Sequence, residues 1–287
     1  MTEPLLPASL LARLERLQVA NRRRLAGGIG GEHRSPRHGS SLDFADFRDY
    51  YPGDDLRRLD RSALARFDRL LIKLFDAEDD LTLRLLVDNS ASMAGQKLQR
   101  AVELAAALGF AALVRRDVVT VHTFSDPRPG QRLRGRAATG ALFARLGAIA
   151  AEGETRFSAA ADHVLRQQGP PGMTVVLSDL LTPEWDDGLT RLPARNGELV
   201  VVHVLAPEDL DPALSGDVEL VDAETGARVE VSLSASVLDD YRRLARRWQD
   251  DVAGRVRAVG GRHVSVLTTD DVEQIVLGRA RDAGVLR

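Results

Sequence analysis

Five oxygen-bearing side chains stand where apolar runs of the sequence give way to loops. Asp88, Ser90 and Ser92 occupy alternate positions in "LRLLVDNSASM", directly after an apolar run. Thr155 lies in "GETRFSAA", and Asp179 closes the apolar run "MTVVLSD". Carboxylates and hydroxyls without imidazole or thiolate are the ligands of a hard cation. The pattern therefore predicts a site for Mg²⁺ or Mn²⁺, and Ca²⁺ suits so few carboxylates less well.

The alternate spacing of the first three residues has a geometric reason. Beyond the end of a strand, a tight loop can aim Asp88, Ser90 and Ser92 to one side while Asn89 and Ala91 point away. Asp and Ser are also common helix N-caps, and capping would explain either serine without a metal. The Asp-x-Ser-x-Ser motif is weak by itself. Its position after a buried strand favours the metal interpretation.

The elements that must position these residues alternate between strand and helix, which is typical of a parallel sheet covered on both faces. We expect strands at 69–76, 81–88, 118–124, 173–179, 198–207 and 263–267, with 69–76 and 81–88 as neighbours joined by the acidic turn 77–80. We expect helices at 8–24, 96–116, 140–150, 158–168, 183–192, 238–259 and 272–283. In such folds, ligands bind beyond the carboxyl ends of the strands, where Asp88 and Asp179 fall.

One segment departs from this alternation. "VELVDAETGARVEVSL" alternates apolar and polar residues on both sides of Thr225-Gly226, which predicts a β-hairpin near 217–233, inserted between a strand and a helix.

Composition excludes several classes of function. The chain of 287 residues has no cysteine, so disulfides, thiolate metal sites and cysteine nucleophiles are excluded, and the cytoplasm is the expected location. A net charge of −3 gives no general attraction to nucleic acid. The longest apolar helical stretch, 101–114, contains Glu103 and is shorter than the roughly 20 residues of a membrane span. We therefore expect neither nucleic-acid binding nor a membrane span.

A metal-dependent phosphatase or phosphoesterase is the alternative function, because two aspartates and Mg²⁺ can support phosphoryl transfer. The sequence lacks a phosphate-binding loop that ends in Lys-Ser or Lys-Thr, and it lacks a Gly-x-Ser-x-Gly elbow. If Asp88 were a phosphorylated nucleophile, a second acid would be expected two residues later, where Ser90 stands. We therefore expect no catalytic residues and no organic cofactor.

The site motifs "LLVDNSASM", "GETRFSAA" and "VVLSDL" resemble the metal-ion-dependent adhesion site of von Willebrand factor A domains. The segment from Gly31 through "YYPGDDLRRLD" to "LFDAE", together with "LAPEDLDPALSGDVELVDAETGARVEV", resembles the bacterial family called domain of unknown function fifty-eight. The two segments lie within residues 31–233. The resemblance implies a von Willebrand factor A-like, Rossmann-like domain at 79–287. Residues 1–78, with the N-terminal helix, the Gly-rich loop 27–41 and the signature region, would pack on it.

The resemblance also implies a role. Members of this family are commonly encoded beside MoxR-type AAA+ ATPases and are thought to act as their partners or adaptors in protein assembly or activation. By the resemblance, Ser90, Ser92 and Thr155 would bind the metal directly, and one or both of Asp88 and Asp179 would bind it through water. A carboxylate from the ATPase or its client would complete the coordination. Arg61 stands where the family usually has Trp, and "YYPGDD" is an alternative docking region.

Overall fold

The computed structural model describes residues 4–20, 44–51, 59–60, 63–64, 66, 69–75, 81–125, 130–166, 172–192 and 197–287. The chain forms two compact units, one of residues 1–28 and 81–287 and one of residues 29–80. The N-terminal helix thus belongs to the larger unit, whereas the expected division grouped it with the residues up to 78. The Gly-rich loop 27–41, Arg61 and most of "YYPGDD" lie outside the described residues.

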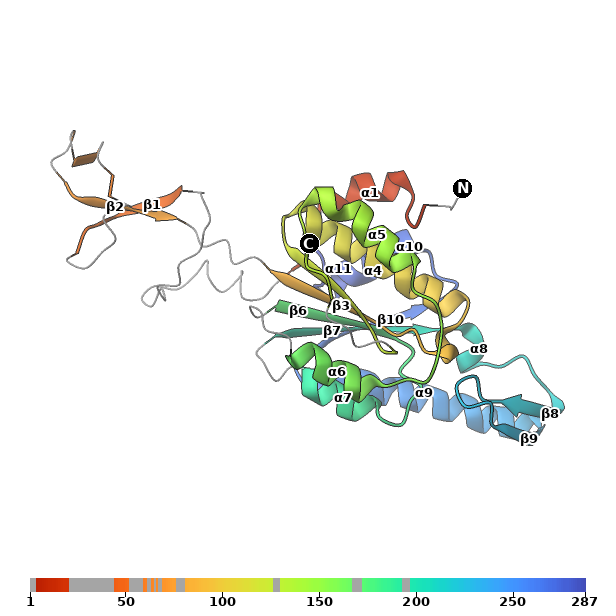
Figure 1. Ribbon diagram of the computed structural model, residues 1–287. Coiled ribbons are helices and arrows are strands. Elements are labelled where there is room, and N and C mark those ends of the chain that lie inside the picture. Colours follow the sequence, from red (N-terminus) through yellow and green to blue (C-terminus); the bar gives the residue numbers. More distant parts are fainter. Residues whose placement is uncertain are drawn as a thin grey trace. The chain divides into compact units, whose positions relative to one another are not determined.

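A six-stranded sheet forms the centre of the larger unit (Figure 1). Its strands are β3 (Thr82–Val87), β4 (Val118–Thr123), β5 (Leu133–Arg134), β6 (Gly172–Ser178), β7 (Glu198–Leu205) and β10 (Arg262–Leu267). They follow the order β10-β7-β6-β3-β4-β5, and every neighbouring pair is parallel except β4 with the edge strand β5. The expected mostly parallel sheet is confirmed, although β5 was not expected. Because β3 leads to β4 on one side and β6 lies on the other, the strand order reverses between β3 and β6.

Helices cover both faces of this sheet, as expected for the α/β class (Figure 1). One face carries α1 (Ala8–Leu14), α4 (Gln96–Val114), α5 (Thr139–Gly147) and the C-terminal series α10 (Val272–Gln274), η5 (Ile275–Arg279, a π-helix) and α11 (Ala280–Asp282). The other face carries α6 (Phe157–Arg166), α7 (Trp185–Arg191) and α9 (Ala235–Ala258). The helix expected at 8–24 ends at Leu14, because the chain then becomes extended and Val19 forms a bridge with Leu286.

The apolar pattern of β3 explains why its end is fixed in space. Leu83, Leu85 and Val87 belong to the buried cluster on the α4 side, whereas Leu86 belongs to the cluster with α6 and α7 on the opposite side. All four side chains are fully buried, and burial of such a side chain contributes about 1.5–3 kcal/mol. A shift of β3 by one residue would exchange its two faces. The residues that follow β3 therefore start from a defined position.

The smaller unit contains a separate two-stranded sheet. In it, β1 (Phe44–Asp49) pairs antiparallel with β2 (Leu71–Phe75). The expectation that 69–76 would pair with 81–88 was wrong, since β3 has β4 on one edge and β6 on the other and so has no free edge for β2.

The inserted hairpin is confirmed as β8 (Gly216–Val221) paired antiparallel with β9 (Arg228–Leu233). It follows the short helix α8 (Pro207–Leu210) and precedes α9. In Figure 1 it lies beyond the carboxyl ends of the sheet strands, beside the first turns of α9. Most of its residues are exposed, so the larger unit holds the hairpin through few buried contacts.

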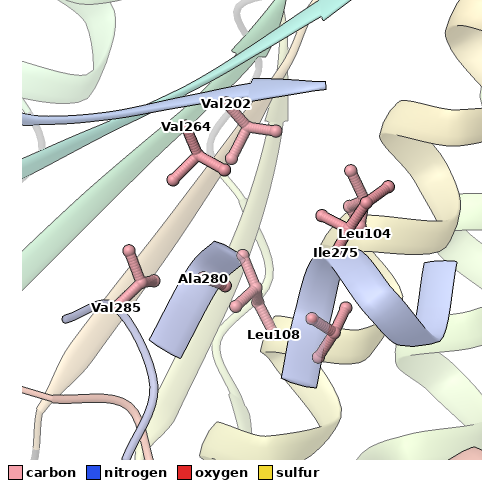
Figure 2. A pocket seen from close by; sticks show the side chains of 8 residues that line it. Leu104, Leu108, Val202, Val264, Ile275, Ala280 and Val285 are labelled. Atoms are coloured by element: carbon pink, nitrogen blue, oxygen red, sulfur yellow. The ribbon is translucent and has the colours of Figure 1, made fainter. Parts of the chain in front are cut away.

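A small cavity between α4, β7, β10 and the C-terminal helices has no polar side chain in its lining. Figure 2 shows its lining, which is wholly apolar: Leu104, Leu108, Val202, Val264, Ile275, Val276, Ala280 and Val285. With a volume of about 10 Å³, it is at the lower limit for one water molecule and has no polar partner for it. Across the described ranges, no helix combines the length and apolar character needed to cross a membrane.

Candidate metal site

Asp88 is held rigidly at the carboxyl end of β3. Its side chain is fully buried, and its backbone N–H donates to Leu177 O of β6 at 2.9 Å. Asp88 Oδ1 accepts from the Ser90 N–H at 3.0 Å, and Oδ2 accepts from the Ser178 hydroxyl at 2.5 Å. Burial raises the pKa of Asp88 to about 6, although the bonds from Ser178 and Ser90 act in the opposite direction. Each carboxylate oxygen keeps a lone pair for another partner.

Ser90 and Ser92 face each other directly after Asp88. Their hydroxyl oxygens lie 3.0 Å apart, and Ser90 is fully buried. Ser90 precedes the short 3₁₀ turn η2 (Ala91–Met93), but its side chain makes no capping hydrogen bond. Helix α4 begins after Gly95, also without a side-chain cap. Capping therefore does not account for these two serines, and their hydroxyls stay available at the site.

Asn89 fastens the loop that carries Thr155 to the loop that carries Asp88. Its Nδ2 donates to Ser125 Oγ at 2.7 Å and to Ala150 O at 3.1 Å, while its Oδ1 accepts from Ser125 N at 3.1 Å. Two backbone bonds reinforce the contact, from Glu152 N to Asn89 O at 2.8 Å and from Ala91 N to Gly153 O at 3.0 Å. Asn89 thus points away from the serines, as expected, and it positions the second loop of the site.

Thr155 is already bound by a carboxylate of the same chain. Its backbone N–H donates to Glu224 Oε2 at 2.8 Å, and its hydroxyl donates to Glu224 Oε1 at 2.6 Å. Glu224 comes from the turn between β8 and β9, 69 residues further along the chain. A hydroxyl that donates its proton still has both lone pairs for a cation.

Asp179 is neutralised by a lysine. Its Oδ2 lies 2.7 Å from Lys97 Nζ, with both side chains nearly buried, and its Oδ1 accepts from Leu181 N at 3.1 Å. Lys97 also lies 3.5 Å from Asp209. Burial by itself lowers the pKa of Lys97, but the Asp179 and Asp209 carboxylates outweigh it and raise that pKa above its ordinary value.

The backbone after Asp179 is strained. The buried Leu180 has φ 54°, in the left-handed region that a leucine seldom adopts. Two hydrogen bonds hold this conformation, from Leu180 N to Ser178 Oγ at 2.9 Å and from Leu181 N to Asp179 Oδ1 at 3.1 Å. The side chains of Ser178 and Asp179 therefore fix the course of the loop after β6.

The five expected residues thus lie near the switch point, but they are not equally available to a metal ion. Asp88, Ser90 and Ser92 form one cluster, and the backbone pairing through Asn89 brings the Thr155 loop beside it. Asp179 is close enough to affect the charge state of Asp88, yet Lys97 occupies one of its oxygens. Asp179 therefore suits an indirect role better than direct coordination.

Sequence reasoning missed three residues of the site. Lys97 is one of only two lysines beside 37 arginines, a rarity that could have singled it out. Ser178 immediately precedes Asp179, so its proximity could have been noticed. Glu224 carried no signal, because only the folded hairpin brings it to Thr155.

The donor set fits a hard cation only if hydroxyls take part. Among the described residues, no group of three or more His, Cys, Asp or Glu side chains is placed to hold a metal. Asp88, Ser90, Ser92 and Thr155 instead offer one carboxylate and three hydroxyl oxygens, and oxygen-only sets of this kind suit Mg²⁺ or Mn²⁺. Such a set leaves a divalent ion short of negative charge.

The sheet order and the loops at its switch point define a von Willebrand factor A-like α/β domain. Residues 46–251 match the model of the family described as "Protein of unknown function DUF58". The chain belongs to this bacterial family.

Relatives in mycobacteria align along almost the whole chain. "Uncharacterized protein Mb1516" of Mycobacterium bovis and "Uncharacterized protein Rv1480" of Mycobacterium tuberculosis are each 29% identical over 303 residues, which cover 96% of this chain and 91% of the relative. "Uncharacterized protein MAV169" of Mycobacterium avium is 35% identical over 130 residues, which cover 43% of this chain and 76% of that protein.

Two solved structures from Bacteroides are more distant. The conserved hypothetical protein BatB from Bacteroides thetaiotaomicron aligns with 63% of this chain and 98% of its own, at 14% identity and a TM-score of 0.36. An aerotolerance-related membrane protein from Bacteroides fragilis, with multiple mutations to serines, aligns with 71% of this chain and 98% of its own, at 15% identity and a TM-score of 0.41. Similarity at this level says nothing about function.

Proposed function

We propose that this protein is a non-catalytic interaction module that binds Mg²⁺ or Mn²⁺ and uses the ion to engage a carboxylate of a protein partner. Asp88, Ser90, Ser92 and Thr155 would hold the ion, and Asp179 would act indirectly. The observation that carries the proposal is the pair of hydrogen bonds from Thr155 to Glu224, at 2.8 and 2.6 Å. This part of the site accepts a carboxylate, as the docking of an acidic partner residue requires.

The charge of the site supports the same conclusion. Asp88 is the one carboxylate among the four proposed ligands. The nearby Asp179 carboxylate is neutralised by Lys97. A divalent ion there would keep positive charge and would attract a further anion. A partner carboxylate that reaches the ion loses water on docking, which strengthens its electrostatic attraction to the ion.

The partner that we propose is a MoxR-type AAA+ ATPase or a client of that ATPase, in protein assembly or activation. Support for this choice comes from the sequence resemblance described above. A cytoplasmic location, expected from the absence of cysteine, belongs to the same proposal. A metal-dependent phosphatase or phosphoesterase remains the alternative, but no contact of Asp88 or Asp179 favours it.

Calorimetry with Mg²⁺ or Mn²⁺ tests the ion. We expect one site in the wild-type protein and no binding by Asp88→Ala, which removes the ionised ligand. The exposed Asp251 on α9 provides a matched control, and Asp251→Ala should bind like the wild type. Equal binding by Asp88→Ala and the wild type would refute the site.

Partner capture tests the role of the ion. A pull-down with the MoxR-type ATPase should succeed with Mg²⁺ and fail with a chelator, while circular dichroism of this protein stays unchanged, because the buried sheet does not depend on the ion. Ser90→Ala and Thr155→Ala should weaken capture and keep the fold. Undiminished capture in chelator would mean that the partner docks on another surface, with "YYPGDD" as the next candidate.

A further inference from the structure

The turn of the hairpin is fixed by its own hydrogen bonds. Asp222 Oδ1 accepts from Glu224 N at 3.0 Å, from Thr225 N at 2.7 Å and from Thr225 Oγ1 at 2.8 Å. These bonds hold the pKa of Asp222 below its ordinary value. Gly226 provides the positive φ, 70°, that lets the chain return to β9. The turn is therefore shaped before it meets the rest of the protein.

This preformed turn delivers a single carboxylate to the site. Asp222, Ala223 and Thr225 are exposed, whereas Glu224 is half-buried against Thr155. Both Glu224 oxygens are used, one by the backbone N–H and one by the hydroxyl of Thr155. The bonds within the turn already fix its conformation, so the turn does not need the contact with Thr155 to fold. The contact instead places both oxygens of one carboxylate on a proposed metal-binding residue.

We propose that Glu224 is a carboxylate ligand of the cation site supplied by the chain itself, in the place that a partner's carboxylate would otherwise take. This inference rests on the function proposed above. The Thr155 hydroxyl donates to Glu224 and keeps its lone pairs, so the present contact is compatible with an ion at Thr155. A cation short of negative charge would attract Glu224, and a partner must displace that carboxylate to dock. The hairpin thus competes with the partner for the site.

A purely structural clamp is the competing explanation. Thr155 lies two residues before α6, and a carboxylate near a helix N-terminus is stabilising by about 0.3–1 kcal/mol without any ion. A clamp predicts that removing Glu224 lowers stability and leaves the affinity for external carboxylates unchanged. A cation ligand predicts two opposite changes, namely weaker cation binding and stronger binding of an external carboxylate.

Binding of manganese and of acetate to the 287-residue chain distinguishes these explanations. Electron paramagnetic resonance measures Mn²⁺ affinity, and the relaxation of water protons reports acetate binding to the manganese-loaded protein. Glu224→Gln keeps the shape of the side chain but loses its charge. Because one ionised ligand is lost, we expect Mn²⁺ to bind about tenfold more weakly to this variant. Because its place is then open to an external carboxylate, we expect acetate to bind about tenfold more tightly. Glu230→Gln is the matched control, since Glu230 is an exposed glutamate on β9 of the same hairpin.

Each outcome has a defined meaning. Mn²⁺ binding with the same acetate affinity in Glu224→Gln and the wild type would overturn the inference and leave the proposed function standing. Absence of Mn²⁺ binding by the wild type would overturn the proposed function, and the inference with it. Hydrogen exchange without metal tests the contact separately. The Thr155 N–H should exchange at least tenfold faster in Glu224→Ala but not in Glu230→Ala, and equal exchange in Glu224→Ala and the wild type would overturn the inference.

Discussion

Lys97 Nζ lies 2.7 Å from Asp179 Oδ2, and the two side chains are 11% and 2% exposed. The ammonium group of Lys97, the second residue of α4, thus lies at the switch point of the sheet. Because Lys97 occupies Asp179, the ion of the proposed function would depend on Asp88 and the hydroxyls. The ion pair also ties the start of α4 to the end of β6.

Replacing Lys97 should affect stability and cation binding in opposite directions. Lys97→Met leaves the buried Asp179 carboxylate without its partner, and we expect the free energy of unfolding in urea to fall by about 3–5 kcal/mol without metal. Mg²⁺ affinity should rise, because a positive charge has left the site, and saturating Mg²⁺ should restore part of the lost stability. Arg243→Met is the control, since its ion pair with Asp240 is exposed and should contribute at most about 1 kcal/mol. A loss no larger than the control's would contradict this account.

Ser178 should matter for cation binding although it is not a proposed ligand. Its hydroxyl donates to Asp88 Oδ2 at 2.5 Å and accepts from Leu180 N at 2.9 Å. In Ser178→Ala, we expect Mg²⁺ affinity to fall about 10–100-fold, because the ligand carboxylate loses the group that orients it. Calorimetry measures this change.

Ser232→Ala provides the matched control for Ser178→Ala. It removes a similar bond, from the Ser232 hydroxyl to Asp217 Oδ1 at 2.6 Å, on the exposed hairpin. Its Mg²⁺ affinity should equal that of the wild type. If both alanine variants bound Mg²⁺ like the wild type, Ser178 would have no part in positioning Asp88.

We expect no hydrolysis of ATP or of p-nitrophenyl phosphate by the purified protein with Mg²⁺ or Mn²⁺. The position two residues after Asp88 carries Ser90, whose hydroxyl pairs with Ser92, so no acid stands where a leaving group would need a proton. Asp179 is held by Lys97. A colorimetric phosphate assay checks this expectation, with Asp179→Ala in parallel. Turnover in the wild type that disappears in Asp179→Ala would favour the phosphatase alternative.

The stability of the protein should fall in mild acid because of His122. Burial lowers the pKa of His122 to about 4, with His163, Arg145 and Arg84 adding to the effect, against 6.5 for an ordinary histidine. The folded state therefore resists protonation, so this stability is fully present above pH 6.5 and is lost as the pH falls towards 4. The loss should be about 3 kcal/mol by pH 4, at 1.36 kcal/mol for each pKa unit.

Urea unfolding of the wild type and of His122→Gln between pH 7 and pH 4 measures this effect. Glutamine can still form a hydrogen bond with Thr120 Oγ1, which lies 3.0 Å from His122 Nε2 in the wild type. Between pH 7 and pH 4, the free energy of unfolding of His122→Gln should fall by about 3 kcal/mol less than that of the wild type. Equal slopes for the two proteins would contradict the low pKa.

The sequence by itself determined the framework of the larger unit. Apolar runs such as 173–179 alternate with amphipathic helices, and this periodicity depends only on near neighbours, so it predicted the parallel sheet and both of its covered faces. The places of Asp88 and Asp179 followed from the same pattern, because all parallel strands end at one edge of the sheet. The hairpin at 217–233 was also predicted, since its alternation and the Thr-Gly turn are local.

The tertiary structure decided which charges meet. Lys97 reaches Asp179 across 82 residues, and Glu224 reaches Thr155 across 69. A local pattern contains no information on contacts at that separation, because they depend on where whole elements pack. The partner of β2 was mispredicted for the same reason: strand pairing depends on which edges are free, and both edges of β3 are taken within the parallel sheet. Composition and spacing therefore predicted a metal site, whereas only the fold placed Lys97 beside Asp179 and Glu224 beside Thr155.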